Sequence, residues 1–85
     1  MYRVLLERRA EKELDTLEQL SRKRVVERIL MLGKNPRQLH AKKLEGFKNA
    51  WRLRIGNFRV IYEIDDREKK VLVYRIRERG SAYKD

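Results

Sequence analysis

The stretch from Trp51 to Tyr62 constrains the fold of this chain more than any other part of it. Apolar residues occupy every second position in both of its halves, and Gly56 and Asn57 separate the halves. Two alternating segments around such a two-residue turn predict a β-hairpin with a fixed register. In that register Arg54 lies opposite Arg59. The chain is therefore expected to contain an antiparallel strand pair at its centre.

The predicted hairpin divides its side chains between two faces, because successive residues of a strand point to opposite sides. One face collects the apolar side chains of Trp51, Leu53, Ile55, Phe58, Val60 and Tyr62. The other carries Arg52, Arg54 and Arg59. Like charges placed opposite each other are destabilising, whereas arginine binds phosphate through paired donors. This pattern favours an anion-binding face over a basic surface that Glu63 and Glu78 merely balance.

The net charge of the chain supports the same interpretation. Its 85 residues include 23 lysines and arginines against 13 acidic residues, which gives a net charge of +10. An excess of one sign indicates a nucleic acid or an acidic protein as partner. A surface rich in charges of both signs, as heat-adapted proteins have, explains the number of charges but not their imbalance.

The composition also excludes several classes of site. The chain has no cysteine and one histidine, His40, so a thiolate or histidine metal site and a Ser-His-Asp triad are not expected. Neither a cofactor motif nor a metal motif is present. No apolar run approaches the length of a membrane span, and no signal peptide is recognisable. We expect one cytoplasmic domain over residues 1–85, with no membrane contact.

The remaining segments predict two helices and two further strands. Alternation over residues 2–7 indicates a strand, and apolar residues three and four apart indicate a helix over about residues 9–18. A second helix is expected to begin at an N-cap, Ser21, and to end at a left-handed Gly33. Residues 34–50 have no period and predict a loop that contains at most one extended residue pair.

The last predicted strand covers residues 71–77. Its alternation favours Leu72, Tyr74 and Ile76 in the core, which leaves Arg77 on the side of the hairpin arginines. The opposite phase also fits, because the start of this run is apolar on both faces. Tyr83 follows in a polar tail, where it could stack on a nucleobase or fold over an edge of the core.

These elements define an α+β fold with the order β-α-α-β-β-β. A helical hairpin needs an apolar surface, and a sheet with one apolar face supplies it. We therefore expect the helices on one face of a small, mainly antiparallel four-stranded sheet. The last three strands form a meander, and the first strand lies at an edge or parallel to another strand. Lys42, Lys43 and Lys48 add positive charge just before the hairpin.

Three stretches together resemble the RelE/ParE superfamily of type II toxin–antitoxin toxins, and its RelE branch in particular: Lys43–Gly46, Trp51–Tyr62 and Arg75–Tyr83. The resemblance covers nearly the whole chain. It implies an endoribonuclease that cuts messenger RNA in the ribosomal A site without a metal or other cofactor. The 2′-hydroxyl of the RNA attacks the adjacent phosphate and leaves a 2′,3′-cyclic phosphate and a free 5′-hydroxyl.

The resemblance also implies roles for individual residues. Arg59 corresponds to the arginine that stabilises the pentavalent phosphate, and Arg77 to the one that assists the leaving oxygen. Tyr83 corresponds to the tyrosine that stacks on the base. Arg52 and Arg54 stand where the best-known member has lysines. Further basic residues are expected to contact RNA or the ribosome: Lys42, Lys43, Lys48 and Arg79.

The sequence does not identify the general base that accepts the proton of the 2′-hydroxyl. Arginine stays protonated, with a pKa above about 12, so the base would be a carboxylate, a lysine such as Lys48, or water. The sequence continues for only two residues after Tyr83, which leaves no room for the C-terminal helix of many relatives. An acidic, RelB-like antitoxin would then inhibit by covering the basic face. The resemblance further implies that the toxin–antitoxin complex binds operator DNA.

Two other functions fit parts of the sequence. One is a ParE-like poison of DNA gyrase, which binds a protein and cleaves no RNA; the pair of Arg77 and Tyr83 argues against it. The other is a weakly active or non-catalytic basic RNA-binding module, which the arginines at positions 52 and 54 keep open.

Overall fold

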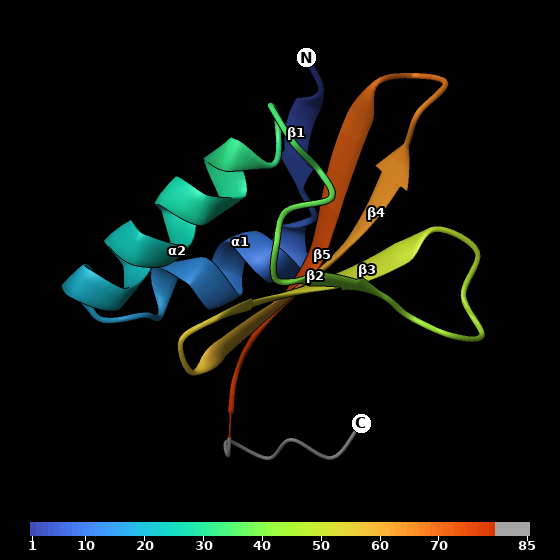
Figure 1. Ribbon diagram of the computed structural model, residues 1–85. Helices are drawn as coiled ribbons and strands as arrows, with labels where there is room; N and C mark the ends of the chain where they lie inside the picture. Colours follow the sequence, from blue (N-terminus) through green and yellow to red (C-terminus); the bar gives the residue numbers. More distant parts are fainter. Residues whose placement is uncertain (80–85) are drawn as a thin grey trace.

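The computed structural model describes residues 1–79, in which two helices cover one face of a mixed five-stranded sheet (Figure 1). The elements are β1 (Arg3–Leu6), α1 (Arg8–Asp15), α2 (Gln19–Met31), β2 (Ala41–Lys43), β3 (Ala50–Ile55), β4 (Phe58–Asp65) and β5 (Lys70–Glu78). The strand order is β1-β5-β4-β3-β2. β1 runs parallel to β5, and every other neighbouring pair is antiparallel. The predicted α+β class and helical hairpin are confirmed.

The central hairpin has the register that its sequence predicts. Arg54 pairs with Arg59, and Trp51 pairs with Tyr62. Gly56 has a φ of +57°, a conformation that glycine adopts at no steric cost and that the tight hairpin turn requires. The local pattern of apolar residues and turn residues was sufficient here because both strands and their connection lie within one short stretch.

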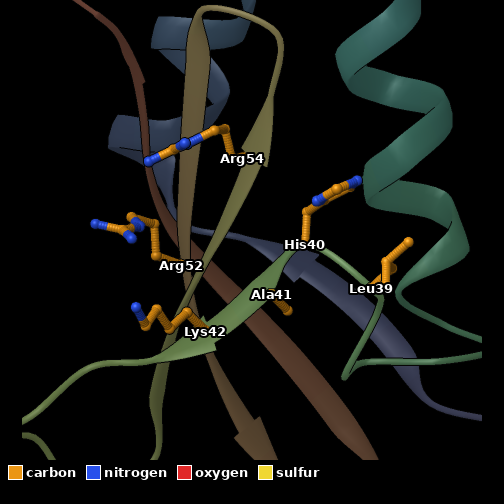
Figure 2. Close-up of a pocket in the computed structure, with 6 residues that line it drawn as sticks. All are labelled: Leu39, His40, Ala41, Lys42, Arg52 and Arg54. Carbon is orange, nitrogen blue, oxygen red and sulfur yellow. The ribbon is translucent and has the colours of Figure 1, made fainter.

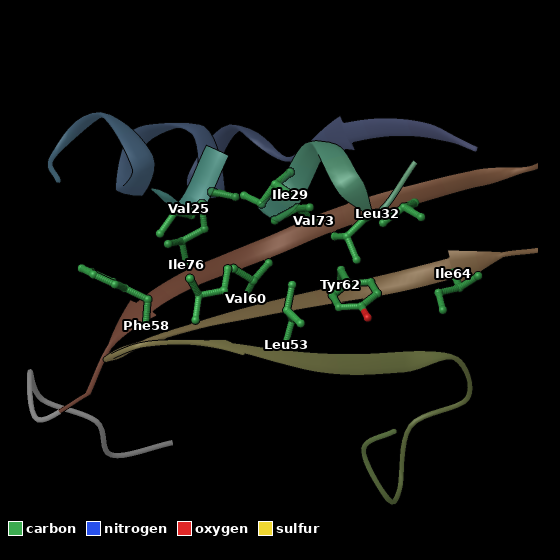
Figure 3. Packing of buried hydrophobic residues seen from close by; sticks show 13 residues of the cluster. Val25, Ile29, Leu32, Leu53, Phe58, Val60, Tyr62, Ile64, Val73 and Ile76 are labelled. Carbon is green, nitrogen blue, oxygen red and sulfur yellow. The ribbon is translucent and has the colours of Figure 1, made fainter. Parts of the chain in front are cut away.

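The core fills the space between the helices and the apolar face of the sheet (Figure 3). Val25 and Ile29 of α2 pack over this face, on which Leu53, Val60 and Tyr62 are fully buried. Burying apolar surface supplies about 25 cal/mol per Å². Among residues 1–79, no helix covers the face with the arginines, which we call the open face of the sheet.

The sheet has five strands rather than the predicted four. β2 lies within the segment that the sequence predicts to be a loop, and its three residues pair with Trp51–Leu53 of β3. A strand of three residues is too short to show a period. It forms because the edge of β3 offers unpaired backbone groups, which the preceding chain can satisfy.

The boundaries of the helical hairpin also differ from the prediction. α1 ends at Asp15, and α2 begins at Gln19, before Ser21. The N-cap of α2 is Glu18, whose carboxylate accepts a hydrogen bond from the backbone N–H of Ser21 at 3.1 Å. A carboxylate at this position satisfies a free N–H and interacts favourably with the helix dipole, so the helix starts earlier.

Gly33 does not have the left-handed conformation that its position after α2 suggested. Within residues 1–79, positive φ angles occur at Lys69, Gly46 and Gly56. Gly33 is needed for a close approach instead, because a Cβ built there would lie 3.0 Å from the carbonyl oxygen of Tyr2. The Gly33 carbonyl in turn accepts a hydrogen bond from the Tyr2 N–H at 2.8 Å. This contact holds the start of β1 against the end of α2.

Gly33→Ala is therefore expected to lower the free energy of unfolding by about 1–3 kcal/mol, the usual effect of forcing an extra carbon into a packed site. The measurement is urea unfolding followed by circular dichroism. Lys34→Ala is the matched control, because Lys34 is exposed and such surface changes stay within about 0.5 kcal/mol. Equal unfolding midpoints for the two variants would contradict the steric explanation.

In β5 the residues that face the core have odd numbers in the first half of the strand and even numbers in the second half. In its first half Val71 and Val73 are buried, whereas Leu72 and Tyr74, predicted for the core, lie on the open face. The pairing with β4 then shifts at Tyr74, and the bulge restores the predicted phase, so that Ile76 is buried. A bulge adds one unpaired residue and reverses the alternation that follows it. The pattern of apolar residues alone cannot reveal it.

Glu13 of α1 completes the edge of β5 beyond the end of β1. The parallel pairing with β1 reaches Val73, and farther along the backbone N–H of Ile76 donates to Glu13 Oε1 at 2.8 Å. Glu13 Oε2 accepts from Arg75 Nη2 at 2.9 Å and from its Nε at 3.0 Å. One carboxylate thus pairs a strand N–H and a guanidinium, and fixes α1 to the sheet.

Tyr62 is the buried titratable group with the largest expected effect on the pH dependence of stability. Its hydroxyl donates to the Pro36 carbonyl at 2.6 Å, and burial raises the pKa of Tyr62 to about 12. The unfolded chain releases this proton above about pH 10, whereas the folded chain keeps it. Stability is thus intact below pH 10 and falls as the pH rises towards 12, by about 1.4 kcal/mol per pH unit.

Urea unfolding at pH 8, 10 and 11 tests this expectation. The difference in unfolding free energy between wild type and Tyr62→Phe should shrink above pH 10, because phenylalanine has no proton to lose. At pH 8 the variant should be less stable by about 1 kcal/mol, the contribution of one hydrogen bond. A difference that is constant across this range would contradict the raised pKa.

Candidate nucleic-acid interface

A row of arginines crosses the open face of the sheet. Arg54 of β3 lies opposite Arg59 of β4, and Arg59 lies opposite Arg77 of β5. Neighbouring strands are about 4.8 Å apart, so the Cα atoms of this row span roughly 10 Å. Three residues predicted as catalytic are thus brought together from three strands. We call these three residues the arginine row.

A basic cavity of about 360 Å³ adjoins the row at the β2 edge (Figure 2). Arg52 and Arg54 of β3 line it together with Lys42 of β2, which pairs with Arg52. Figure 2 shows their three cationic groups pointing to the same side of the strands. Three cations around one cavity form a site suited to a phosphate or another anion.

The guanidinium group of Arg52 has a buried nitrogen whose hydrogen-bonding capacity the described part of the fold does not use. Its Nε is buried and has no hydrogen-bond partner within residues 1–79. A buried donor left without a partner destabilises a protein by about 1–3 kcal/mol. Such groups are rare and call for an explanation. A guanidinium that is positioned for a ligand rather than for a partner in the fold provides one.

A smaller cavity of about 130 Å³ lies at the hairpin turn, on the other side of Arg54. Arg54, Arg59 and Arg79 line it, together with the turn residues. The backbone N–H of Arg79 donates to the Asn57 carbonyl at 2.6 Å, which holds the end of β5 beside the turn. Arg54 therefore lies between two cavities that are both lined by cations.

Arg24 is a basic residue that the sequence did not connect with this site. Its guanidinium lies against the hairpin turn, because a Cβ built on Gly56 would be 3.0 Å from Arg24 Nη1. On the sequence it is one of several basic residues on the outer face of α2. Only the tertiary contact between helix and turn distinguishes it, and no local signal could have done so.

Other predicted site residues lie apart from the arginine row. Lys43 pairs with Trp51, on the side of the sheet opposite to Lys42. Lys48 is exposed in the connection between β2 and β3, where it lines a different, largely apolar cavity. Tyr83 lies outside the described residues.

The two basic cavities contain no evident general base. Within the described residues no carboxylate lines either of them. Glu63 is engaged elsewhere, since it accepts a hydrogen bond from the Tyr74 hydroxyl at 3.1 Å. His40 borders the larger cavity, but its imidazole points towards α2 and away from the guanidinium groups (Figure 2). The arrangement can bind an anion and stabilise charge that develops on it.

Residues 1–79 contain no group of three or more histidine or acidic side chains placed to hold a metal ion. Neither α1 nor α2 is long and apolar enough to cross a bilayer.

The fold and the open face together define a small α+β protein whose sheet presents a row of cationic side chains and two cavities lined by them. Residues 4–83 match the family described as the ParE toxin of the type II toxin–antitoxin system parDE. The chain belongs to this family, and the predicted membership of the RelE/ParE superfamily is confirmed.

Several relatives are named RelE. The chain is 31% identical to the RelE1 protein of Methanocaldococcus jannaschii, over 99% of this chain and 97% of that one. The archaeal RelE–RelB complex of Pyrococcus horikoshii contains a similar structure, with a TM-score of 0.81, 30% identity and coverage of 95% and 98%. The RelBE2 toxin–antitoxin complex of Mycobacterium tuberculosis gives a TM-score of 0.81, 28% identity and coverage of 92% and 98%.

Proposed function

We propose that this toxin is a ribosome-dependent endoribonuclease that cuts messenger RNA in the A site. The observation that carries the proposal is the arginine row, in which Arg54, Arg59 and Arg77 lie side by side on an open sheet face. Guanidinium groups placed around a phosphate stabilise the charge that accumulates on it during cleavage. A face that only had to be soluble would not gain from three adjacent like charges.

The proposed reaction uses the RNA as its own nucleophile. The 2′-oxygen forms a bond to the adjacent phosphorus as the bond from phosphorus to the 5′-oxygen breaks. The proton of the 2′-hydroxyl passes to water or another base, and the departing 5′-oxygen gains a proton. The products are a 2′,3′-cyclic phosphate and a free 5′-hydroxyl, so the reaction consumes no water and no cofactor.

Each arginine has a part in this proposal. Arg59, at the centre of the row, binds the non-bridging oxygens of the pentavalent phosphate, and Arg77 stabilises the leaving 5′-oxygen. Arg52 and Arg54 lower the pKa of the 2′-hydroxyl by favouring the negative charge that forms there. Tyr83 stacks on a base next to the cleaved bond. Lys42, Arg79 and other basic residues bind the RNA backbone and the ribosome.

The proposed partner that controls the toxin is an antitoxin with an acidic segment. Two related structures are RelE–RelB complexes, and the net charge of +10 suits an acidic peptide. Such a segment would inhibit by covering the arginine row. We further propose that the protein acts in the cytoplasm and that the toxin–antitoxin complex binds its operator DNA.

The test is to incubate the purified toxin with translating ribosomes and, separately, with the same messenger RNA alone. We expect new 5′-hydroxyl ends at A-site codons on ribosomes, 2′,3′-cyclic phosphate on the upstream fragments, and intact RNA without ribosomes. Ends that are scattered over free RNA to the same extent would contradict the ribosome dependence.

One alternative has a specific observation in its favour, since the matching family is described by the ParE toxin of parDE. A gyrase poison would leave messenger RNA intact and trap broken DNA in a reaction with gyrase. Intact message together with intact DNA would instead indicate a basic RNA-binding module.

A further inference from the structure

A largely apolar cavity of about 320 Å³ lies on the same open face as the arginine row. Phe47, Ile61 and Tyr74 provide apolar and aromatic walls, and Asn49 and Glu63 provide polar groups. Phe47 is 64% exposed, although its side chain is one of the largest apolar ones. An exposed aromatic ring beside a concave apolar surface is a common feature of ligand sites.

Strand register places this cavity close to the arginine row. Ile61 pairs with Arg52, two residues along β3 and β4 from the pair of Arg54 and Arg59. Two residues along a strand correspond to about 7 Å, so the cavity begins within that distance of the row. Arg52 connects the two, because it lines the basic cavity and neighbours Ile61. The cavity is therefore within reach of a nucleotide next to one whose phosphate is bound at the row.

The bulge in β5 shapes the wall of this cavity. It turns Tyr74 to the open face, where the hydroxyl donates to Glu63 Oε1 at 3.1 Å. This bond fixes the orientation of the carboxylate and leaves Oε2 as an acceptor. Burial and the bond to Glu63 raise the pKa of Tyr74, so the hydroxyl remains a donor. Asn49, which also lines the cavity, is held beside β4 by its carbonyl, which accepts from the Ile64 N–H at 3.1 Å.

These groups fit a nucleobase. Bases of single-stranded RNA bind by stacking on aromatic rings and by hydrogen bonds along their edges. A fixed carboxylate oxygen accepts from an exocyclic amino group, as in the pairing of glutamate with the amino group of cytosine. Adenine, cytosine and guanine carry such a group, and uracil does not.

We propose that this cavity binds one RNA base next to the cleaved phosphate and selects a base with an exocyclic amino group. The inference rests on the proposed function, because it assumes that RNA lies on the arginine row. A segment of the acidic antitoxin is the competing occupant. Lys48 in the lining would attract an acidic peptide, but the Glu63 carboxylate, which is the fixed acceptor of the cavity, would repel it.

Binding of short oligonucleotides tests the proposal without cleavage. The probes are fluorescent 2′-deoxy tetranucleotides, which lack the attacking hydroxyl and differ at one position by adenine or uracil. When the varied position is the one that occupies the cavity, wild type is expected to bind the adenine probe about tenfold more tightly than the uracil probe. This factor is within the range that one base contact supplies. At the other three positions the two probes should bind equally. Glu63→Gln should reduce the ratio at the cavity position to about twofold or less, because an amide can also donate to uracil.

Two further variants separate base recognition from general charge. Phe47→Ala should weaken both probes about fivefold or more through loss of stacking. Glu45→Gln is the matched control for Glu63→Gln, because Glu45 is exposed in the connection between β2 and β3 and its substitution changes the net charge by the same amount. The ratio of its affinities for the adenine and uracil probes should equal that of wild type. Circular dichroism melting confirms that each variant is folded.

The outcomes separate this inference from the proposed function. If the toxin cuts messenger RNA on ribosomes but Glu63→Gln and Phe47→Ala bind both probes like wild type, the base site is wrong and the function stands. If no RNA is cut, the function is wrong whatever the probes show. If Phe47→Ala weakens the complex with the antitoxin and leaves both probe affinities unchanged, the cavity is a peptide site.

Discussion

Arg59→Ala is expected to lower the rate of messenger RNA cleavage on ribosomes by about 10²–10³, the usual effect of removing one donor to a developing charge. Arg59 lies at the centre of the arginine row, between Arg54 and Arg77. It is therefore the member of the row that can contact the phosphorus-bound oxygens when its neighbours contact the attacking and leaving oxygens. Its loss should affect the transition state more than the ground state.

Single-turnover cleavage on programmed ribosomes measures this effect apart from binding. Arg59→Lys should recover only part of the rate, because an ammonium group replaces the charge but not the paired donors of arginine. Arg8→Ala is the matched control, since Arg8 is an exposed arginine of α1, the helix on the other side of the sheet. A loss of similar size in Arg8→Ala would show that net charge, and not the row, determines the rate.

Glu13→Ala is expected to lower the free energy of unfolding by about 2–3 kcal/mol. The carboxylate accepts from the Ile76 N–H and from Arg75, and both side chains of the ion pair are only 24% exposed. Its removal leaves a strand N–H and a partly buried guanidinium without their acceptor, and hydrogen bonds to charged groups contribute about 1.5–3 kcal/mol.

Urea unfolding of three variants tests this explanation. Glu13→Gln keeps an acceptor for the Ile76 N–H and should lose about half as much stability as Glu13→Ala. Glu11→Ala removes an exposed carboxylate from the first turn of the same helix and should change stability by less than about 1 kcal/mol. Equal losses for Glu13→Ala and Glu11→Ala would mean that helix charge, rather than the bond to β5, is responsible.

The sequence predicted best what depends on neighbours along the chain. The register of the hairpin followed from Gly56 and Asn57, and it placed Arg54 opposite Arg59 before any tertiary contact was known. The position of Arg77 beside Arg59 also agrees with the prediction, although the strand reaches it through a bulge. Alternation and turn chemistry are local properties, so a single sequence contains them.

The features that the sequence missed depend on contacts between distant segments. β2 exists because β3 has a free edge, and the close packing at Gly33 exists because Tyr2 approaches it. The bulge at Tyr74 turns an expected core residue into part of the apolar cavity. None of these has a period or a motif of its own. For this reason the sequence predicted the cationic residues of the site but not the apolar cavity that lies beside the arginine row.

The parallel pairing of β1 with β5 has a consequence for the synthesis of this protein. Within residues 1–79, β1 lies at the edge of the sheet and pairs with β5, from which it is separated by the rest of the fold in the sequence. Contacts between such distant segments form late in folding. Arg77 belongs to the same last strand, so the arginine row is incomplete while β5 is inside the exit tunnel. The arginine row of a nascent chain can therefore form only after β5 has left the tunnel.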